Sequence, residues 1–378
     1  MDVFNFLLRT NFFIKIKRSV DDDKGVNDMF ALVGLGVNGI NSINLHGMDV
    51  LKKSDLIYLD GYTTPIPANF VKALSLQIGK EVTVLKRAEL EDKIDSILNR
   101  AKTMNISLAV LGDPLLATTH MNFVVESKKS GVLYTVVHNT SIVSLLTSCC
   151  GLHPYKFGRV ATIIRESGTP ATSVYFTLYD NLIKGMHSIF LLEFNTESGE
   201  GVSPTSAFKI LENAEKVYKL GAFSEDTFLI VACRIERDDQ KFYAGVVSEL
   251  EGIDFGDPPY SIVIPSKLHF TEEETIQVLY NIEKDKVKDN TKNMKKRVEY
   301  LVNKYVNKTR DTLKEAKDKI SHGKSKDLDE LFENVECYLD DSIRFLNSGE
   351  EHLAMLSVGY AEGLLDSLRF QKILDLKW

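Results

Sequence analysis

The stretch ALVGLGVNGI, residues 31–40, joins a short apolar run to Gly34, Gly36 and Gly39 in the spacing G-x-G-x-x-G. This pattern is typical of a buried strand that runs into a tight glycine turn, and it predicts an α/β fold. The stretch LIYLD ends in Asp60, about twenty residues after the last glycine, where a dinucleotide-binding unit would hold the ribose. Because glycines allow close backbone approach to any ligand, the pattern alone leaves the cofactor open.

The composition is that of a globular protein. The chain has 378 residues, of which 44% are hydrophobic and 26% are charged, and this length is enough for two or three domains. The net charge of −7 disfavours non-specific binding of nucleic acid by the whole surface. The four cysteines have no paired C-x-x-C spacing, which predicts reduced thiols in a cytoplasmic protein and no metal site.

The first 28 residues differ in character from the rest of the chain. They mix apolar and basic residues without the features of a signal peptide, and we expect a poorly ordered appendage, with Met29 as a second possible start. No run of about 18 apolar residues occurs, so no transmembrane helix is predicted.

From Met29 to about Lys284 the pattern predicts two α/β lobes, residues 29–137 and 138–284, that join near His138. The apolar runs expected as strands are FALVGLG, LIYLD, VTVLK, SLAVLGD and YTVVHN in the first lobe, and RVATIIRE, SIFLLEF, TFLIVACRIE, QKFYAGVV and YSIVIP in the second. A helix between two of the later runs has Ser203 placed as its N-cap and Gly221 just past its end.

After Glu283 the strand signals vanish, and apolar residues at helical spacing predict a third domain of three helices, residues 285–378, with turns at Gly323 and NSGEE. Residues 286–326 hold fourteen Lys and Arg against five Asp and Glu, whereas residues 327–378 hold four against twelve. Antiparallel helices of opposite charge would attract one another, which favours a self-complementary bundle. The alternative is that the basic segment 286–326 docks RNA or an acidic partner.

The stretches richest in polar residues and turns lie at the ends of later strands. LAVLGDPLLATTH, residues 108–120, places Gly112 and Asp113 after an apolar run, and VVHNTSI, residues 136–142, offers Asn139, Thr140 and Ser141 as helix caps. The stretch DFGDPPYSIVIPSKLHF, residues 254–270, repeats Gly-Asp-Pro. Open α/β sheets bind ligands in loops at the carboxyl ends of their strands, so we expect the site there.

These stretches carry a family resemblance. From about Met29 to about His269 the chain resembles the diphthine synthases, the diphthamide-pathway branch of the tetrapyrrole-methylase-like superfamily of methyltransferases that use S-adenosylmethionine. The match rests on GLG at 34–36, LGDPLLATTH at 111–120, VVHNTSI at 136–142, GLHPYKFG at 151–158, FGDPP at 255–259 and KLH at 267–269. In related methylases the first turn usually reads G-P-G-D, whereas here Gly36 is followed by Val37 and Asn38.

The resemblance implies methylation, from S-adenosylmethionine, of the amino group of a modified histidine on translation elongation factor 2, by a homodimer. Archaeal members make the trimethylated amine, and eukaryotic members add a further methyl to the carboxylate. Carried over position by position, the resemblance implies cofactor contacts at Val37, Asp113, Leu116, Ser141, Ile142, Leu192, Ile235 and His269. The C-terminal region from about Lys292 resembles a small helical domain of archaeal proteins with no established role, best at YAEGLLDSLR, residues 360–369.

Several roles and functions stay open at this level. Methyl transfer requires an unprotonated amine, so His120 and His138 are candidate bases, although a structural hydrogen bond is the favoured role for each. Asp113 fits either a turn or recognition of the cofactor ribose or amine, and Asp257 fits a structural role. No catalytic residue is assigned. The alternative functions are a corrinoid or porphyrinoid methylase, an NAD dehydrogenase, and a non-catalytic binding protein.

Overall fold

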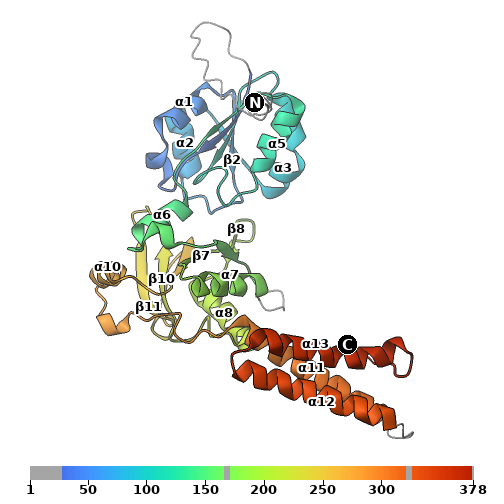
Figure 1. Ribbon diagram of the computed structural model, residues 1–378. Coiled ribbons are helices and arrows are strands. Elements are labelled where there is room, and N and C mark those ends of the chain that lie inside the picture. Colours follow the sequence, from blue (N-terminus) through green and yellow to red (C-terminus); the bar gives the residue numbers. More distant parts are fainter. Residues whose placement is uncertain (1–27, 166–170, 321–325, 377–378) are drawn as a thin grey trace, which may run out of the picture.

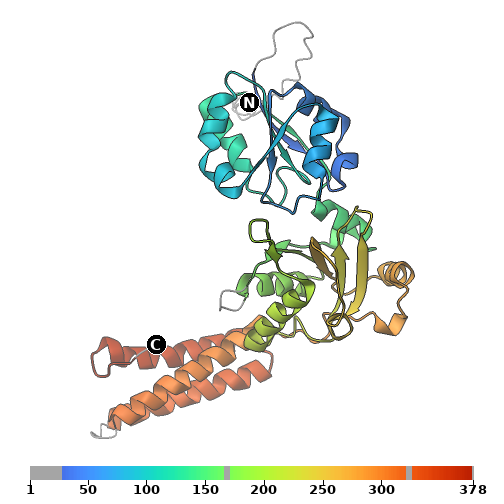
Figure 2. The ribbon, with the colours of Figure 1, turned by 180° about the vertical axis from the view of Figure 1, so that it is seen from behind.

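The computed structural model of the protein describes residues 28–165, 171–320 and 326–376. Within these ranges two α/β lobes follow one another along the chain, and a three-helix arm projects from the second lobe (Figures 1 and 2). Residues 1–27 of the expected appendage and Gly323 lie outside the described residues. No helix in the described ranges is long and apolar enough to span a membrane.

The first lobe contains a five-stranded parallel sheet in the order β3-β2-β4-β1-β5. Its neighbouring side chains alternate between two cores: Phe30 and Leu32 pack on one face, and Ala31 and Val33 pack on the other. Burial on both faces explains why these strands are continuous apolar runs. The strands are β1 Phe30–Gly34, β2 Leu56–Asp60, β3 Val82–Leu85, β4 Ile106–Val110 and β5 Tyr134–Val137.

Helices cover both faces of this sheet, as Figure 1 shows for α1 and α2 on one side and α3 and α5 on the other. The chain after the glycine turn makes only one short 3-10 turn, η1 Gly39–Ser42, before the first α-helix begins at Leu45. Asn44 caps that helix by accepting a hydrogen bond from the Gly47 amide at 2.7 Å. The helices are α1 Leu45–Lys53, α2 Phe70–Ile78, α3 Arg87–Asp92, α4 Ile94–Arg100 and α5 Met121–Ser130.

The second lobe contains a mixed five-stranded sheet in the order β11-β10-β12-β7-β6. Only β6 and β7 pair in parallel, and the other three pairs are antiparallel. All five expected runs form strands: β6 Ala161–Ile163, β7 Ser188–Leu192, β10 Phe228–Cys233, β11 Lys241–Val246 and β12 Tyr260–Ile264. A two-stranded hairpin of β8 Phe194–Asn195 and β9 Glu200–Gly201 follows β7.

Two layers of helices enclose this second sheet. Tyr175 and Phe208 bring α7 and α8 against one face, and Leu146 and Ile276 bring α6 and α10 against the other. Ser203 caps α8 as expected, but the left-handed residue that ends this helix is Lys219 rather than Gly221. The helices are α6 Ile142–Cys149, α7 Thr172–Ile183, α8 Pro204–Tyr218, α9 Val247–Leu250 and α10 Phe270–Tyr280, with 3-10 turns η2 Pro154–Lys156 and η3 Lys284–Lys286.

The lobes meet at α6, which lies at their junction in Figure 1. A second connection comes from Arg237, whose Nη2 donates to the Pro65 carbonyl oxygen at 3.5 Å. Residues 137–142, which lead from β5 of the first sheet into α6, therefore carry the chain across a crevice between the carboxyl ends of the first-lobe strands and the second lobe.

The arm consists of α11 Arg297–Ile320, α12 Lys326–Asn347 and α13 Glu351–Phe370, packed around one apolar core. Ion pairs join the helices of opposite charge, including Arg310 to Asp340 at 3.0 Å and Lys317 to Glu336 at 2.7 Å. Ion pairs between the basic helix and the acidic helix are the contacts expected of a self-complementary bundle. The contacts that attach the arm to the second lobe include the Tyr179 hydroxyl, which donates to the Lys295 carbonyl oxygen at 2.9 Å, and the Lys295 amide, which donates to the Leu220 carbonyl oxygen at 2.8 Å.

Candidate active site

The glycine turn after β1 is closed by the chain itself. Gly36 and Gly112 exchange two backbone hydrogen bonds, of 2.8 and 3.2 Å, and the Asn38 amide donates to the Ser42 hydroxyl at 3.0 Å. A dinucleotide-binding turn would direct such amides at a pyrophosphate. Because these amides are engaged within the lobe, the glycine pattern does not mark a dinucleotide site here.

Close packing of three strand ends explains the first glycine. A Cβ atom at Gly34 would lie 2.8 Å from the Gly112 carbonyl oxygen and 2.9 Å from both Asn139 Cβ and Pro114 Cδ. No real Cβ contact is that short, so any side chain would push these loops apart. The turn thereby brings the ends of β1, β4 and β5 together at one edge of the sheet.

Asp60, the residue that would hold a dinucleotide ribose, is buried and serves the loop after β2. Its Oδ1 accepts hydrogen bonds from the amides of Tyr62 at 2.8 Å and Thr63 at 3.2 Å. Its Oδ2 accepts one from the Thr63 hydroxyl. This carboxylate shapes the turn that presents Thr63 and Thr64 to the crevice, so its role is structural.

Asp113 ties the loop after β4 to the loop after β5. Its Oδ1 accepts from the Leu115 amide at 2.9 Å, which is the turn-stabilising bond expected of this residue. Its Oδ2 accepts from the Asn139 amide at 3.1 Å and lies 2.9 Å from Nδ1 of His138. Because the side chain keeps 12% of its surface exposed, the carboxylate is both fixed and within reach of a ligand.

The loop after β5 is built to start a helix at the crevice. Asn139 Nδ2 donates to the carbonyl oxygens of Gly34 and Ser42, each at 3.0 Å, which holds this loop against the glycine turn. Ser141 then caps α6, and its hydroxyl accepts from the Ser144 amide at 3.3 Å. Ser141 and Ile142 are thereby held at the crevice.

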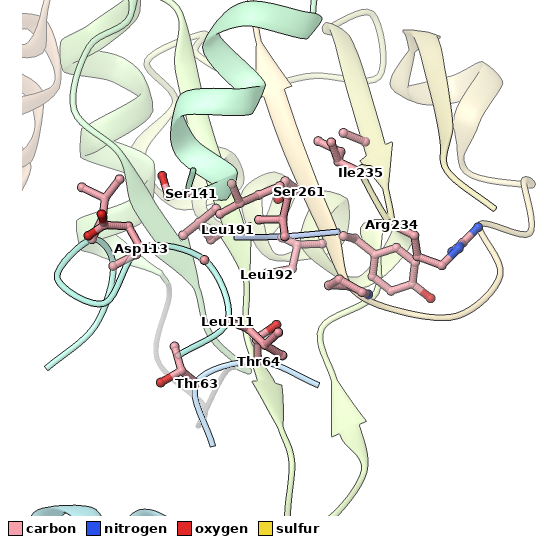
Figure 3. Close-up of a pocket in the computed structure, with 18 of the residues that line it drawn as sticks. Thr63, Thr64, Leu111, Asp113, Ser141, Leu191, Leu192, Arg234, Ile235 and Ser261 are labelled. Carbon is pink, nitrogen blue, oxygen red and sulfur yellow. The ribbon is translucent and has the colours of Figure 1, made fainter. Parts of the chain in front are cut away.

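Arg234 organises the wall of the second lobe. Its guanidinium donates to the carbonyl oxygens of Phe255 at 3.0 Å and of Asp257, and its Nε lies 2.6 Å from the carboxylate of Asp239. Figure 3 shows this guanidinium directed away from the other labelled residues of the crevice. Since its charge is satisfied within the lobe, Arg234 acts as a support for the loop that leads to Tyr260.

A cavity of about 160 Å³ lies between these two walls. Figure 3 shows side chains of both lobes around it, from Asp113 at one end to Arg234 at the other. Most of the lining is aliphatic, and the polar groups lie at strand ends. The first lobe and α6 contribute Val37, Thr63, Thr64, Pro67, Leu111, Gly112, Asp113, Leu116, Ala117, Thr118, Ser141 and Ile142, and the second lobe contributes Leu191, Leu192, Ala232, Arg234, Ile235, Arg237, Pro259, Tyr260 and Ser261.

The structure brings seven of the eight residues named from the resemblance into this one lining: Val37, Asp113, Leu116, Ser141, Ile142, Leu192 and Ile235. Sequence reasoning missed Thr63, Thr64, Arg234, Tyr260 and Ser261 as lining residues. Each of them follows or begins a strand at the same edge as the seven, so strand ends were the available signal. Whether these residues contact a cofactor stays a prediction.

His269 is the eighth residue and does not line the cavity. It caps α10, with its Nδ1 2.8 Å from the Thr271 hydroxyl, and its ring centroid lies 5.3 Å from that of His153. In this arrangement the His269 ring is part of the packing between α10 and the loop before η2.

The buried Glu272 joins the two stretches, 151–158 and 267–269, that belong to this part of the lobe. It accepts hydrogen bonds from the amides of His153 and His269, both at 2.8 Å, from His187 Nε2 at 2.9 Å and from Lys156 Nζ at 2.5 Å. Burial by itself would raise the pKa of Glu272, but these hydrogen bonds outweigh it and lower the pKa to about 2. The motif residues here form a structural support behind the crevice.

The two candidate bases have different surroundings. The ring of His120 is buried, and burial lowers its pKa although the Asp60 carboxylate, 3.4 Å from Nε2, opposes that shift. The His138 side chain is 66% exposed and contacts Asp113. Neither histidine lines the cavity, but His138 is accessible beside it.

Comparison with known proteins connects this geometry to a family. Residues 29–251 match the family described as "Tetrapyrrole (Corrin/Porphyrin) Methylases". The diphthine synthase of Methanothermobacter thermautotrophicus is 32% identical over 65% of this chain and 93% of its own length, and that of Methanocaldococcus jannaschii is 32% identical over 66% of this chain and 98% of its own. A crystal structure of a diphthine synthase, 25% identical, superimposes with a TM-score of 0.61 over 68% of this chain and all of the other.

The chain is a diphthine-synthase-type member of the tetrapyrrole methylase family. Diphthine synthases and tetrapyrrole methylases use S-adenosylmethionine as methyl donor, and the protein is a methyltransferase of this kind. Residues 304–374 of the arm match a family described as "Protein of unknown function (DUF357)". The helical arm is therefore similar to a different family from that of the methyltransferase lobes.

The lining of the cavity fits S-adenosylmethionine. The donor has a flat base, a ribose, a sulfonium and an amino acid, so its site needs apolar walls with polar groups at the ends. Leu191, Leu192 and Ile235 form an aliphatic wall, and the Asp113 carboxylate is positioned to accept from a ribose hydroxyl or an amine. The lining thus suits a partly apolar ligand with hydrogen-bond donors at one end.

Proposed function

We propose that the protein is a diphthine synthase that methylates the amino group of the modified histidine of translation elongation factor 2. The proposal is supported most directly by the crevice itself, because seven residues expected at the cofactor converge there from separate segments of the chain. Family membership over residues 29–251 adds to this support. A porphyrinoid or corrinoid substrate is less well supported, because the relatives with 32% identity are diphthine synthases.

We propose that Val37, Asp113, Leu116, Ser141, Ile142, Leu192 and Ile235 hold the donor. Asp113 accepts hydrogen bonds from it, and the helix start at Ser141 and Ile142 closes one side. Leu192 and Ile235 supply the apolar contact from the second lobe. Bound S-adenosylmethionine supplies an electrophilic methyl group on a sulfonium that is already a good leaving group.

The contribution of the chain is then to position the reactants and to exclude water. Holding the amine and the methyl group in line supplies roughly 7–11 kcal/mol of the barrier reduction, so no covalent nucleophile is needed. The aliphatic lining of the crevice suits this task because it keeps solvent away from the attacking nitrogen. The amine loses its proton before attack, and the exposed imidazole of His138 is the better placed of the two histidines to receive it.

The partners and location follow from the same proposal. Elongation factor 2 is the protein substrate, the enzyme acts as a homodimer, and both are cytoplasmic. Binding of RNA by the segment 286–326 is not favoured, because Arg310, Lys317 and Lys308 of this segment pair with Asp340, Glu336 and Glu362 inside the arm.

The decisive experiment for this function is mass spectrometry of elongation factor 2 from cells with and without the gene. We expect the modified histidine to carry added methyl groups only when the gene is present. Addition of the purified protein and S-adenosylmethionine to the unmethylated factor should restore them. An identical methylation state in both strains, or methylation of a corrinoid or porphyrinoid but not of the factor, would refute the proposal.

A further inference from the structure

The second lobe places two arginines at the crevice, and their charges are satisfied to different degrees. Arg234 is buried, donates to two carbonyl oxygens and lies 2.6 Å from the carboxylate of Asp239. Arg237, three positions later, also lines the cavity, but it forms no ion pair within the described part of the chain. The charge of Arg237 therefore has no carboxylate of its own.

The contacts of the Arg237 guanidinium leave most of its donors unused. A guanidinium carries several N–H donors in one plane. Its Nη2 donates across the crevice to the Pro65 carbonyl oxygen at 3.5 Å, which is long for a hydrogen bond. Among the described residues this is the one acceptor that the guanidinium reaches. The other donors of Arg237 are therefore available to a ligand in the cavity.

Partial burial makes this available charge costly. The Arg237 side chain is half-buried, and burial lowers its pKa, although the Asp239 carboxylate opposes the shift and the charge of Arg234 adds to it. Asp239 is 65% exposed and is already bound to Arg234, so it cannot compensate both arginines. A desolvated cation without a counter-ion costs free energy, and an anionic ligand would recover it.

A hydroxyl group is presented next to this cation. Thr64 directly precedes Pro65 and is among the side chains around the cavity in Figure 3. The hydroxyl of its neighbour Thr63 donates to the buried Asp60 carboxylate, whereas the Thr64 hydroxyl has no hydrogen-bond partner among the described residues. A planar guanidinium and a hydroxyl donor together match the two oxygens of a carboxylate.

We propose that Arg237 and Thr64 form a binding site in the crevice for the carboxylate of an amino-acid group. The inference rests on the proposed function, because that reaction brings two such groups into the crevice. One is the amino-acid end of S-adenosylmethionine, and the other is the side chain that accepts the methyl group. A carboxylate held on either of them would fix the position of the adjacent amine or sulfonium.

The charges of the lining favour a carboxylate over a phosphate. The lining contains two cations, Arg234 and Arg237, and no lysine. Since Arg234 is satisfied within the lobe, one available cation remains, which matches a singly charged anion. The Asp113 carboxylate lies at the opposite end of the cavity from Arg234 in Figure 3, so the crevice has a negative and a positive end. This polarity suits ligands that carry both an amine and a carboxylate.

Calorimetric titration of the full chain tests the donor as the source of the carboxylate. S-adenosylhomocysteine carries the amino-acid group, and methylthioadenosine lacks it. If the donor supplies the carboxylate, Arg237→Met should weaken S-adenosylhomocysteine at least about tenfold and leave methylthioadenosine within about twofold of wild type. Arg237→Lys keeps the charge without the planar fork and should lose less. Arg159→Met, at an exposed arginine of the same lobe outside the lining, is the matched control and should bind both compounds normally.

Steady-state methylation tests the acceptor as the source. If the acceptor supplies the carboxylate, Arg237→Met should keep its affinity for S-adenosylhomocysteine. At saturating S-adenosylmethionine it should lower kcat/KM for elongation factor 2 at least about tenfold, through a higher KM. Thr64→Val removes a neutral donor and should lose about threefold with the same ligand that Arg237→Met affects. Circular dichroism verifies that each variant is folded.

The site is overturned if Arg237→Met matches wild type in both experiments, or if it weakens S-adenosylhomocysteine and methylthioadenosine equally, as a loss of packing would. Losses in Arg237→Met and Thr64→Val that fall on different ligands would also overturn it, because the two residues would not form one site. Failure of the proposed function gives a different result, a wild type that leaves elongation factor 2 unmethylated. In that case the titration alone decides, and normal binding of S-adenosylhomocysteine by Arg237→Met would overturn the site.

Discussion

The carboxylate of Asp113 accepts a hydrogen bond from the backbone amide of Asn139 at 3.1 Å, although 26 positions separate the two residues in the chain. This bond joins the loops after β4 and β5, and both loops line the crevice. The Asp113 carboxylate thus has two roles: it fixes the wall of the cavity, and it remains available to the ligand.

Replacement of Asp113 separates these two uses. We expect Asp113→Ala to raise the dissociation constant for S-adenosylmethionine at least about tenfold, because a hydrogen bond to a charged group contributes about 1.5–3 kcal/mol. The two lost amide bonds should also lower the free energy of unfolding by about 1–2 kcal/mol. Calorimetric titration and urea unfolding measure the two effects.

Asp257→Ala is the matched control, since it alters the second Gly-Asp-Pro, where the backbone oxygen rather than the carboxylate accepts from Arg234. Its affinity for the donor should stay within about twofold of wild type. Equal affinities for Asp113→Ala and wild type would reject the role of Asp113 in donor binding.

The glycine turn gives a prediction about stability. Gly34→Ala forces a Cβ atom to within 2.8 Å of the Gly112 carbonyl oxygen, so we expect about 1–3 kcal/mol of destabilisation and weaker donor binding. Gly252→Ala has open space around its Cβ and should be neutral. Thermal unfolding of both variants checks this, and equal melting temperatures would show that the three loops tolerate a side chain between them.

The buried Glu272 predicts how stability depends on pH. Its pKa falls from 4.5 to about 2 on folding, so its contribution is complete above pH 4.5 and is lost as the pH falls through about 2. Glu272→Gln should lower the free energy of unfolding by about 3 kcal/mol at neutral pH, since it leaves Lys156 without its anion. The difference in free energy of unfolding between the variant and the wild type should become smaller toward pH 2.

Glu274→Gln, at an exposed position of the same helix, provides the control and should follow the wild-type curve. Urea unfolding across the acid range measures all three proteins. A gap that stays constant with pH would mean that Glu272 is not the group that titrates.

One hydroxyl group makes two of the hydrogen bonds that attach the arm to the second lobe. Tyr179 donates to the Lys295 carbonyl oxygen at 2.9 Å and accepts from the Arg297 amide at 2.8 Å. Tyr179→Phe removes both bonds and should cost about 1–2 kcal/mol, seen as faster hydrogen exchange at residues 295–300. Tyr155→Phe, at a side chain that is 95% exposed, should change nothing. Unchanged exchange in Tyr179→Phe would locate the attachment elsewhere.

Much of the fold could be predicted because apolar runs and helical periods are local. All ten strands expected in the lobes form, and so do the three helices of the arm. The order β11-β10-β12-β7-β6 could not be predicted, since pairing depends on contacts between distant segments. The helix α8 ends at Tyr218, two residues earlier than the expected end just before Gly221, because Lys219 adopts the left-handed conformation that the sequence pattern favours for glycine.

The site illustrates the same limit. The Ser42 hydroxyl and the Gly112 carbonyl oxygen accept hydrogen bonds from the turn amides that would otherwise bind a phosphate. These two bonds decide the role of the glycine pattern. Gly112 lies in a different loop, and no spacing around Gly34 indicates that contact. Thr63 and Thr64 were missed, although they follow a strand, because the sequence pattern offers Asp60 as a ribose ligand, whereas the buried carboxylate of Asp60 fixes the turn that presents the two threonines.

The most direct test of the central claim is calorimetric titration of the full chain with S-adenosylmethionine, S-adenosylhomocysteine and NADH. We expect the first two to bind at a single site that Asp113→Ala weakens and Asp257→Ala does not, and we expect no heat from NADH. Binding of NADH, or no binding of either adenosyl compound, would contradict the assignment of the crevice between the lobes as the site of the methyl donor.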